Sequence, residues 1–156
     1  MKLKKNKTGE PAKYELALKL ASQNKPDLTR VAELLERAHK SNDARATYAL
    51  ATWHLFGHAG YSKNINTAVR LLKIAAASDI PTAHFDLAVC YETGQGIKKS
   101  ENMAYRHYLA AALNGDNGSI FEVGRCLFYG LGVKRDRKTA EVWFRRVESL
   151  GFKVES

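Results

Sequence analysis

Apolar residues recur along this chain at the spacing of amphipathic helices, and the pattern repeats. Segments 46–54, 83–91 and 119–127 each carry a small residue, an aromatic residue and an aliphatic residue at alternate positions, and then a second small residue. We predict that each segment is a helix with one buried face. The equivalent positions are Ala46, Ala83 and Ser119; Tyr48, Phe85 and Phe121; Leu50, Leu87 and Val123; Ala51, Ala88 and Gly124; and His54, Tyr91 and Leu127.

A glycine-containing turn follows each of these helices. In the second segment it reads "TGQGIKKS", residues 93–100, whose glycines, lysines and serine are also found in loops that bind phosphate. A true phosphate loop has four residues between its glycines and a lysine directly after the second. Here Gly94 and Gly96 are one residue apart and Ile97 follows. Because Gly130 and Gly132 repeat the turn 36 residues later, we interpret it as the end of a helix in a repeat.

A second helix is predicted after each turn. An apolar residue (Tyr61, Ile97 or Val133) closes the turn, and a capping residue (Asn64, Ser100 or Asp136) precedes the helix. Residues 13–42 have a similar pattern without the glycines. Since one helix pair cannot bury its apolar face alone, we expect the pairs to stack. The prediction is an all-α, right-handed superhelical solenoid of stacked antiparallel helix pairs. It comprises a basic N-terminal arm, 1–12, and a single solenoid domain, 13–156, with a degenerate unit, 13–42, and repeats 43–80, 81–116 and 117–152.

One stretch of the third unit, "YGLGVKRDRKTAEVWFRR", residues 129–146, resembles the consensus of the Sel-one-like repeat family. These proteins are solenoid relatives of the tetratricopeptide repeat. The resemblance implies a protein-binding adaptor or scaffold rather than an enzyme. Some small bacterial members look like immunity proteins, so the resemblance leaves open an alternative in which the chain neutralises a cognate toxin.

The charge of the chain is concentrated near its two ends. The 156 residues carry a net charge of +9, to which segments 1–13 and 133–146 contribute +4 each, while the remainder is about neutral. An acidic protein surface or a toxin domain would suit this charge. A nucleic-acid-associated protein is a further alternative, but no stacking aromatic residues interleave with the lysines and the groove itself is not basic. No apolar segment has membrane-spanning length and no signal sequence is recognisable, so we expect a cytoplasmic protein that does not bind membranes.

No set of residues suggests catalysis, and we expect no enzyme activity, no cofactor and no metal. His54 and His58 are four residues apart but Gly57 ends the helix between them. Cys90 and Cys126 occupy the same repeat position, which is too far apart for a disulfide between stacked helices. We expect both thiols to be reduced and buried.

The candidate partner-binding groove is formed by the first helices of the pairs, which line the concave surface of a solenoid. Phe56, Val89 and Tyr129 are the expected anchors, and Arg45 and Arg125 the expected partners of acidic groups. The alternative is that these are ordinary exposed residues. The nine predicted groove residues, on the side of each first helix opposite the core, are Arg45, Thr52, Phe56, Asp86, Val89, Thr93, Glu122, Arg125 and Tyr129.

Overall fold

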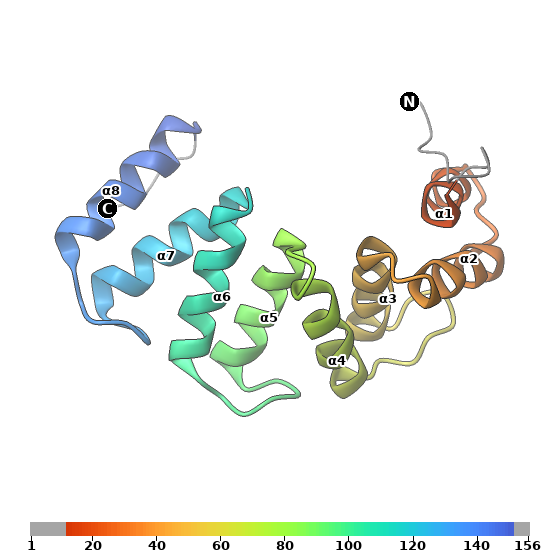
Figure 1. Cartoon of the computed structure of the whole chain (residues 1–156), viewed down its shortest axis with the longest axis horizontal. Helices are drawn as coiled ribbons and strands as arrows, with labels where there is room; N and C mark the ends of the chain where they lie inside the picture. The colour runs from red at the N-terminus through yellow and green to blue at the C-terminus, as the bar shows by residue number, and fades with distance from the viewer. Residues whose placement is uncertain (1–11, 152–156) are drawn as a thin grey trace. The chain divides into compact units, whose positions relative to one another are not determined.

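The computed structural model describes residues 12–151, and in this range it contains eight α-helices and no strand (Figure 1). The all-α repeat architecture is therefore confirmed. Most of the predicted basic arm, residues 1–11, lies outside the described residues. The helices are α1 (Lys13–Ala21), α2 (Leu28–Lys40), α3 (Ala44–Phe56), α4 (Ile65–Ala76), α5 (Pro81–Thr93), α6 (Glu101–Leu113), α7 (Asn117–Tyr129) and α8 (Arg137–Ser149).

The chain divides into two compact units after Ala75. Unit 1 holds α1 to α4, with α1 packed on α2 and α2 on α3. Unit 2 holds α5 to α8, with α5 packed on α6, α6 on α7 and α7 on α8. In unit 2, two successive helix pairs therefore bury faces that one pair alone would expose.

The glycine turns end the first helices as predicted. Gly57, Gly94 and Gly130 are the C-caps of α3, α5 and α7, with φ of 76°, 76° and 79°. In this left-handed region a glycine avoids the clash that a Cβ atom would cause. The N–H of each glycine donates to a carbonyl one turn earlier, at distances of 2.8–2.9 Å.

A second hydrogen bond closes the turn in the same way in every repeat. The N–H groups of Asn64, Ser100 and Asp136 donate to the carbonyls of the equivalent residues His54, Tyr91 and Leu127, at 2.8, 2.9 and 2.9 Å. The three side chains then accept from the first turn of the following helix, as expected of caps. Backbone hydrogen bonds and the capping side chain therefore hold each turn. The lysines that follow the glycines, such as Lys98 and Lys99, are not needed for its shape.

Aliphatic side chains form the core of unit 1. Val31, Leu34 and Leu35 of α2 are 2–3% exposed, and Leu50 of α3 and Leu72 of α4 are 2% and 0% exposed. Burying a side chain of this size stabilises the fold by about 1.5–3 kcal/mol. The helical spacing of these residues is the pattern from which the pairs were predicted.

The core of unit 2 is built around an aromatic side chain. Tyr108 of α6 is 2% exposed and belongs to a buried cluster with Ala88, Val123 and Leu127. At the equivalent position of the next pair, Phe144 of α8 lies against α7. The two small positions of the first helices, Ala88 and Gly124, are both buried, as predicted.

The aromatic position of the predicted buried face is less buried than expected. Tyr48 and Phe85 are half-buried, and Phe121 is 38% exposed. Phe85 packs against the buried cluster that α7 completes. In the described part of the chain no helix follows α8. Phe121 therefore has no following pair that would cover it as α7 helps to cover Phe85.

Candidate partner-binding faces

The predicted groove residues lie on α3 in unit 1 and on α5 and α7 in unit 2. We call them the first-helix face of each unit. In unit 1, Phe56 is 68% exposed, while Arg45 and Thr52 are half-buried. Thr52 Oγ donates to the Ala49 carbonyl at 2.8 Å, so its hydroxyl is satisfied within α3.

In unit 2, the exposed members of the face are Tyr129, at 65%, and Thr93. Asp86, Glu122 and Arg125 are half-buried. Val89 is also half-buried and packs against the aromatic core cluster, so it offers a partner less surface than the two aromatic anchors. Phe56 and Tyr129 are each the last helical residue before a capping glycine.

The guanidinium group of Arg125 is engaged by two carboxylates of the same unit. Its Nη2 lies 2.6 Å from Glu92 Oε1 on α5, and its Nε lies 2.7 Å from Glu122 Oε2. The hydroxyl of Tyr108, on α6, donates to the other oxygen of Glu92 at 2.7 Å. Glu92 thus joins three helices. Burial would raise the pKa of Glu92, but the hydrogen bonds from Arg125 and Tyr108 outweigh it and hold that pKa below its ordinary value.

Arg45 is engaged in a similar way in unit 1. Its Nη1 lies 2.7 Å from Glu15 Oε1 on α1, its Nη2 lies 2.7 Å from Asp43 Oδ2, and its guanidinium carbon lies 4.4 Å from the centroid of the Tyr14 ring. Glu15 is only 6% exposed. Burial opposes ionisation of Asp43, but the hydrogen bonds from Arg45 lower the pKa of that carboxyl.

The two arginines have a common role that the sequence prediction missed. Each joins the first helix of one pair to the first helix of the pair before it, through Glu15 or Glu92. We expected both arginines to meet acidic groups of a partner, but both are already paired within the chain. The signal in the sequence is opposite charge at a separation close to the repeat length, 30 residues for Glu15 and Arg45 and 33 for Glu92 and Arg125.

The histidines and cysteines do not form a metal site. Within residues 12–151, no group of three or more histidine, cysteine, aspartate or glutamate side chains could hold a metal ion. His54 contacts the ring of Tyr61 and His58 that of Phe56. Cys90 and Cys126 are free and buried, as predicted, and burial raises the pKa of Cys126 to about 11.

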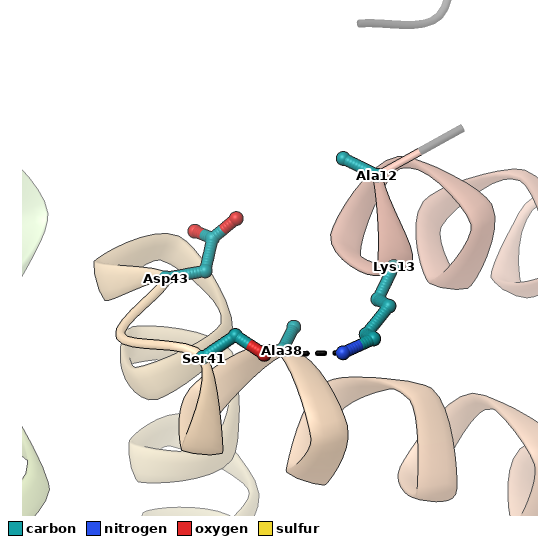
Figure 2. Close-up of a pocket in the computed structure, with 5 residues that line it drawn as sticks. All are labelled: Ala12, Lys13, Ala38, Ser41 and Asp43. Carbon is teal, nitrogen blue, oxygen red and sulfur yellow. Dashed lines mark hydrogen bonds between the residues drawn. The ribbon is translucent and has the colours of Figure 1, made fainter. Parts of the chain in front are cut away.

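A shallow pocket of about 280 Å³ lies in unit 1, where the start of α1 faces the connection between α2 and α3. Figure 2 shows Lys13 reaching Ser41, with a hydrogen bond of 3.1 Å between Nζ and Oγ. Ala12, Ala38 and Asp43 complete the lining. The sequence did not predict this pocket. The ammonium group of Lys13 donates to Ser41, and the carboxylate of Asp43 is paired with Arg45, so both charged groups of the lining already have a contact within the chain.

A family model and solved structures identify the class of protein. The model described as the Sel1 repeat matches residues 44–79, 81–116 and 118–151, so this chain belongs to the Sel1 repeat family, whose repeats act as protein-interaction modules. A Sel1 repeat protein from Oxalobacter formigenes is 30% identical, with a TM-score of 0.71 over 76% of this chain and 89% of that one.

A protective antigen of uropathogenic Escherichia coli with an SLR fold is 27% identical, with a TM-score of 0.82 over 90% of this chain and 30% of that one. An immunity protein from Pseudomonas aeruginosa is 21% identical, with a TM-score of 0.61 over 90% of this chain and 53% of that one, which is a likeness of fold.

A curated relative is much longer than the part that matches. Chitin synthase regulatory factor 3 of Schizosaccharomyces pombe is 27% identical over 124 residues, which are 76% of this chain and 13% of that protein. The match therefore spans only a small part of that protein. Across the described helices, none combines the length and apolar character required to cross a membrane.

Proposed function

We propose that this chain is a protein-binding module that holds its partner against the first-helix faces, without catalysis. Membership of a family of interaction modules supports this proposal. The observation that carries it is the pair of exposed aromatic side chains, Phe56 and Tyr129, at equivalent positions of two repeats. Exposed aromatic residues are favoured as binding hot spots because they desolvate a large area at a small cost in conformational entropy.

The partner can be found by photocrosslinking from the face itself. A photoreactive amino acid at Thr93, which is exposed on α5, should crosslink the partner. The same amino acid at Arg106, exposed on α6, is the control and should not. Crosslinking of the same protein from both positions would show that the partner is not confined to the first helices.

Once the partner has been identified, its affinity can be measured by calorimetric titration. Tyr129→Ala should weaken the binding free energy by about 1–3 kcal/mol, because truncation of an aromatic anchor typically costs this much. The matched control is Leu113→Ala, since Leu113 is 73% exposed but lies at the end of a second helix. Phe56→Ala and Ile74→Ala form the corresponding pair in unit 1. The circular dichroism spectrum should be the same for all four variants. Equal loss in Tyr129→Ala and Leu113→Ala would contradict the proposal.

An immunity role is a narrower form of the same proposal, in which the partner is a toxin domain. The fold shared with an immunity protein and the net charge of +9 are compatible with it. Co-expression with a candidate toxin, with Tyr129→Ala as the variant that loses protection, would test it. The narrower role and a cytoplasmic location stay predictions.

A further inference from the structure

Two glycine turns of unit 2 together form a strongly basic surface, which we call the basic edge. Residues 94–102 and 130–138 contain six cationic side chains, all exposed, and only two acidic ones, Glu101 and Asp136. The connections that hold them, between α5 and α6 and between α7 and α8, run along the same edge of the unit (Figure 1). The six cations of the basic edge are Lys98, Lys99, Lys134, Arg135, Arg137 and Lys138.

The two turns are held together by a close backbone contact. Gly132 lies so near the start of α6 that a Cβ atom there would overlap the Glu101 carbonyl oxygen. The side chain of Asn102 donates to the Gly132 carbonyl at 2.9 Å. A residue other than glycine at position 132 would push the two turns apart. Gly132 therefore allows the cations of both turns to lie on one surface.

Two of the cations are fixed by Phe128. Arg135 Nε donates to the Phe128 carbonyl at 3.1 Å, and the guanidinium carbon of Arg137 lies 4.8 Å from the centre of the Phe128 ring. These contacts orient both guanidinium groups and leave their charge unneutralised. The basic edge is therefore partly preorganised, which lowers the entropic cost of binding an anion.

The charge of the basic edge is largely uncompensated. None of its six cations is in an ion pair with another described residue, although Lys99 lies near enough to Glu92, and Lys138 to Asp136, to lower the pKa of these carboxyl groups. Asp136 is occupied as the cap of α8, where it accepts from Thr139. Arg125, in contrast, is paired with two carboxylates. Acidic groups of a partner therefore find unpaired cations at the basic edge and not at Arg125.

We propose that the basic edge binds an acidic segment of the partner protein, while Tyr129 contacts an apolar residue next to that segment. This inference rests on the proposed function, since it specifies the chemistry of the partner. Tyr129 is the last residue of α7, directly before the second turn. A single-stranded nucleic acid fits less well, because it needs aromatic platforms for successive bases. The neighbouring ring, Phe128, is half-buried and contacts Tyr129 and Arg137.

The test uses the full chain and three fluorescent probes. The first probe is a dodecapeptide of glutamate and aspartate with one phenylalanine, the second has glutamine and asparagine in place of the acids, and the third is a twelve-nucleotide oligothymidine. Anisotropy is measured with the native chain and two variants that each lose three exposed lysines. Lys98→Ser/Lys134→Ser/Lys138→Ser alters the basic edge, and Lys40→Ser/Lys63→Ser/Lys73→Ser is the charge-matched control in unit 1.

The acidic peptide should bind the native chain and the control variant within about twofold of each other, and the edge variant about tenfold more weakly. The neutral peptide should bind none of them. Equal losses in the two variants would show a general effect of net charge and overturn the proposal. Absence of binding of the acidic peptide to the native chain would overturn it as well. If oligothymidine bound more tightly and lost affinity only in the edge variant, the surface would be a nucleic-acid site and the proposal would be wrong.

The same variants distinguish failure of this inference from failure of the proposed function. If the crosslinked partner lost affinity with Tyr129→Ala but not with the edge variant, the first-helix face would stand and the basic edge would not. If the edge variant lost affinity and the aromatic variants did not, binding at the basic edge would be supported and binding at the first-helix face would be contradicted.

Discussion

Arg45 and Arg125 show how single side chains can be placed on a binding face and yet belong to the stability of the fold. Each reaches a carboxylate on the first helix of the preceding pair, Glu15 or Glu92, at 2.6–2.7 Å. Charged groups that are partly removed from water are costly unless paired, so these contacts satisfy groups that packing has already placed. What remains on the face for a partner is mainly aromatic and hydroxyl surface.

The pairing of Glu92 predicts a pH-dependent stability. Glu92→Gln should lower the free energy of unfolding by about 1 kcal/mol at pH 7, a modest value because the pair is partly exposed. Because the pKa of Glu92 is lowered on folding, the contribution of its carboxylate is complete above the unfolded pKa of about 4.3 and is lost as the pH falls through the folded value. The difference in urea denaturation between native chain and variant should therefore be smaller at pH 3 than at pH 7.

The control for this prediction is Glu141→Gln. Glu141 is exposed on α8 and is in no ion pair with a described residue, so its substitution should change the stability little at either pH. A difference between the native chain and Glu92→Gln that was as large at pH 3 as at pH 7 would show that the variant disturbs packing rather than an ion pair.

One small position recurs in the first helix of each repeat. It is Ala51 in α3, Ala88 in α5 and Gly124 in α7. A Cβ atom at Gly124 would lie 2.6 Å from Cε1 of Phe144, a contact that real side chains do not make. The equivalent pairs are Ala51 and Leu72 in the first repeat and Ala88 and Tyr108 in the second. In the last pair, Gly124 leaves room for the Phe144 ring as it lies against α7.

Gly124→Ala should destabilise the chain by about 1–3 kcal/mol, although alanine is the better helix former, because overpacking a filled core forces side chains out of their rotamers. Adding Phe144→Leu should restore part of that loss. A double-mutant cycle measured by urea denaturation gives the coupling. The single and double variants should keep the helical circular dichroism spectrum. If Gly124→Ala were neutral, α7 and α8 would be less tightly packed than the structure shows.

At the scale of the whole chain, the sequence predicted the local features well and the contacts between pairs poorly. Gly94 and Gly130 end helices, and Ser100 and Asp136 begin them, through contacts within a few residues, so their spacing suffices for a prediction. The Glu92–Arg125 pair joins residues 33 positions apart. The contact of Gly132 with the start of α6 likewise joins two repeats. Such contacts follow only from how one pair lies on the next, which helical periodicity does not specify.

In a helical solenoid, a short and poorly capped helix is expected to open before a longer, well-capped one. In unit 1, α1 has nine residues, no side-chain cap at its N-terminus and only Glu15 and Ala17 buried. In contrast, α2 has 13 residues, a cap from Asp27 and four buried apolar residues. Amide hydrogens of α1 should therefore exchange faster than those of α2, with an opening free energy lower by at least about 1 kcal/mol.

A variant that removes the ion pair between Arg45 and Glu15 tests this prediction most directly. Arg45→Ala leaves the buried Glu15 without its cation, so exchange in α1 should accelerate further, while exchange in α7 of the other unit should not change. Arg30→Ala removes an exposed ion pair on α2 and is the control that should leave α1 unaffected. Exchange measured by mass spectrometry on peptides from α1, α2 and α7 resolves these cases. Equal protection of α1 and α2 in the native chain would mean that contacts beyond those of the described residues hold the first helix.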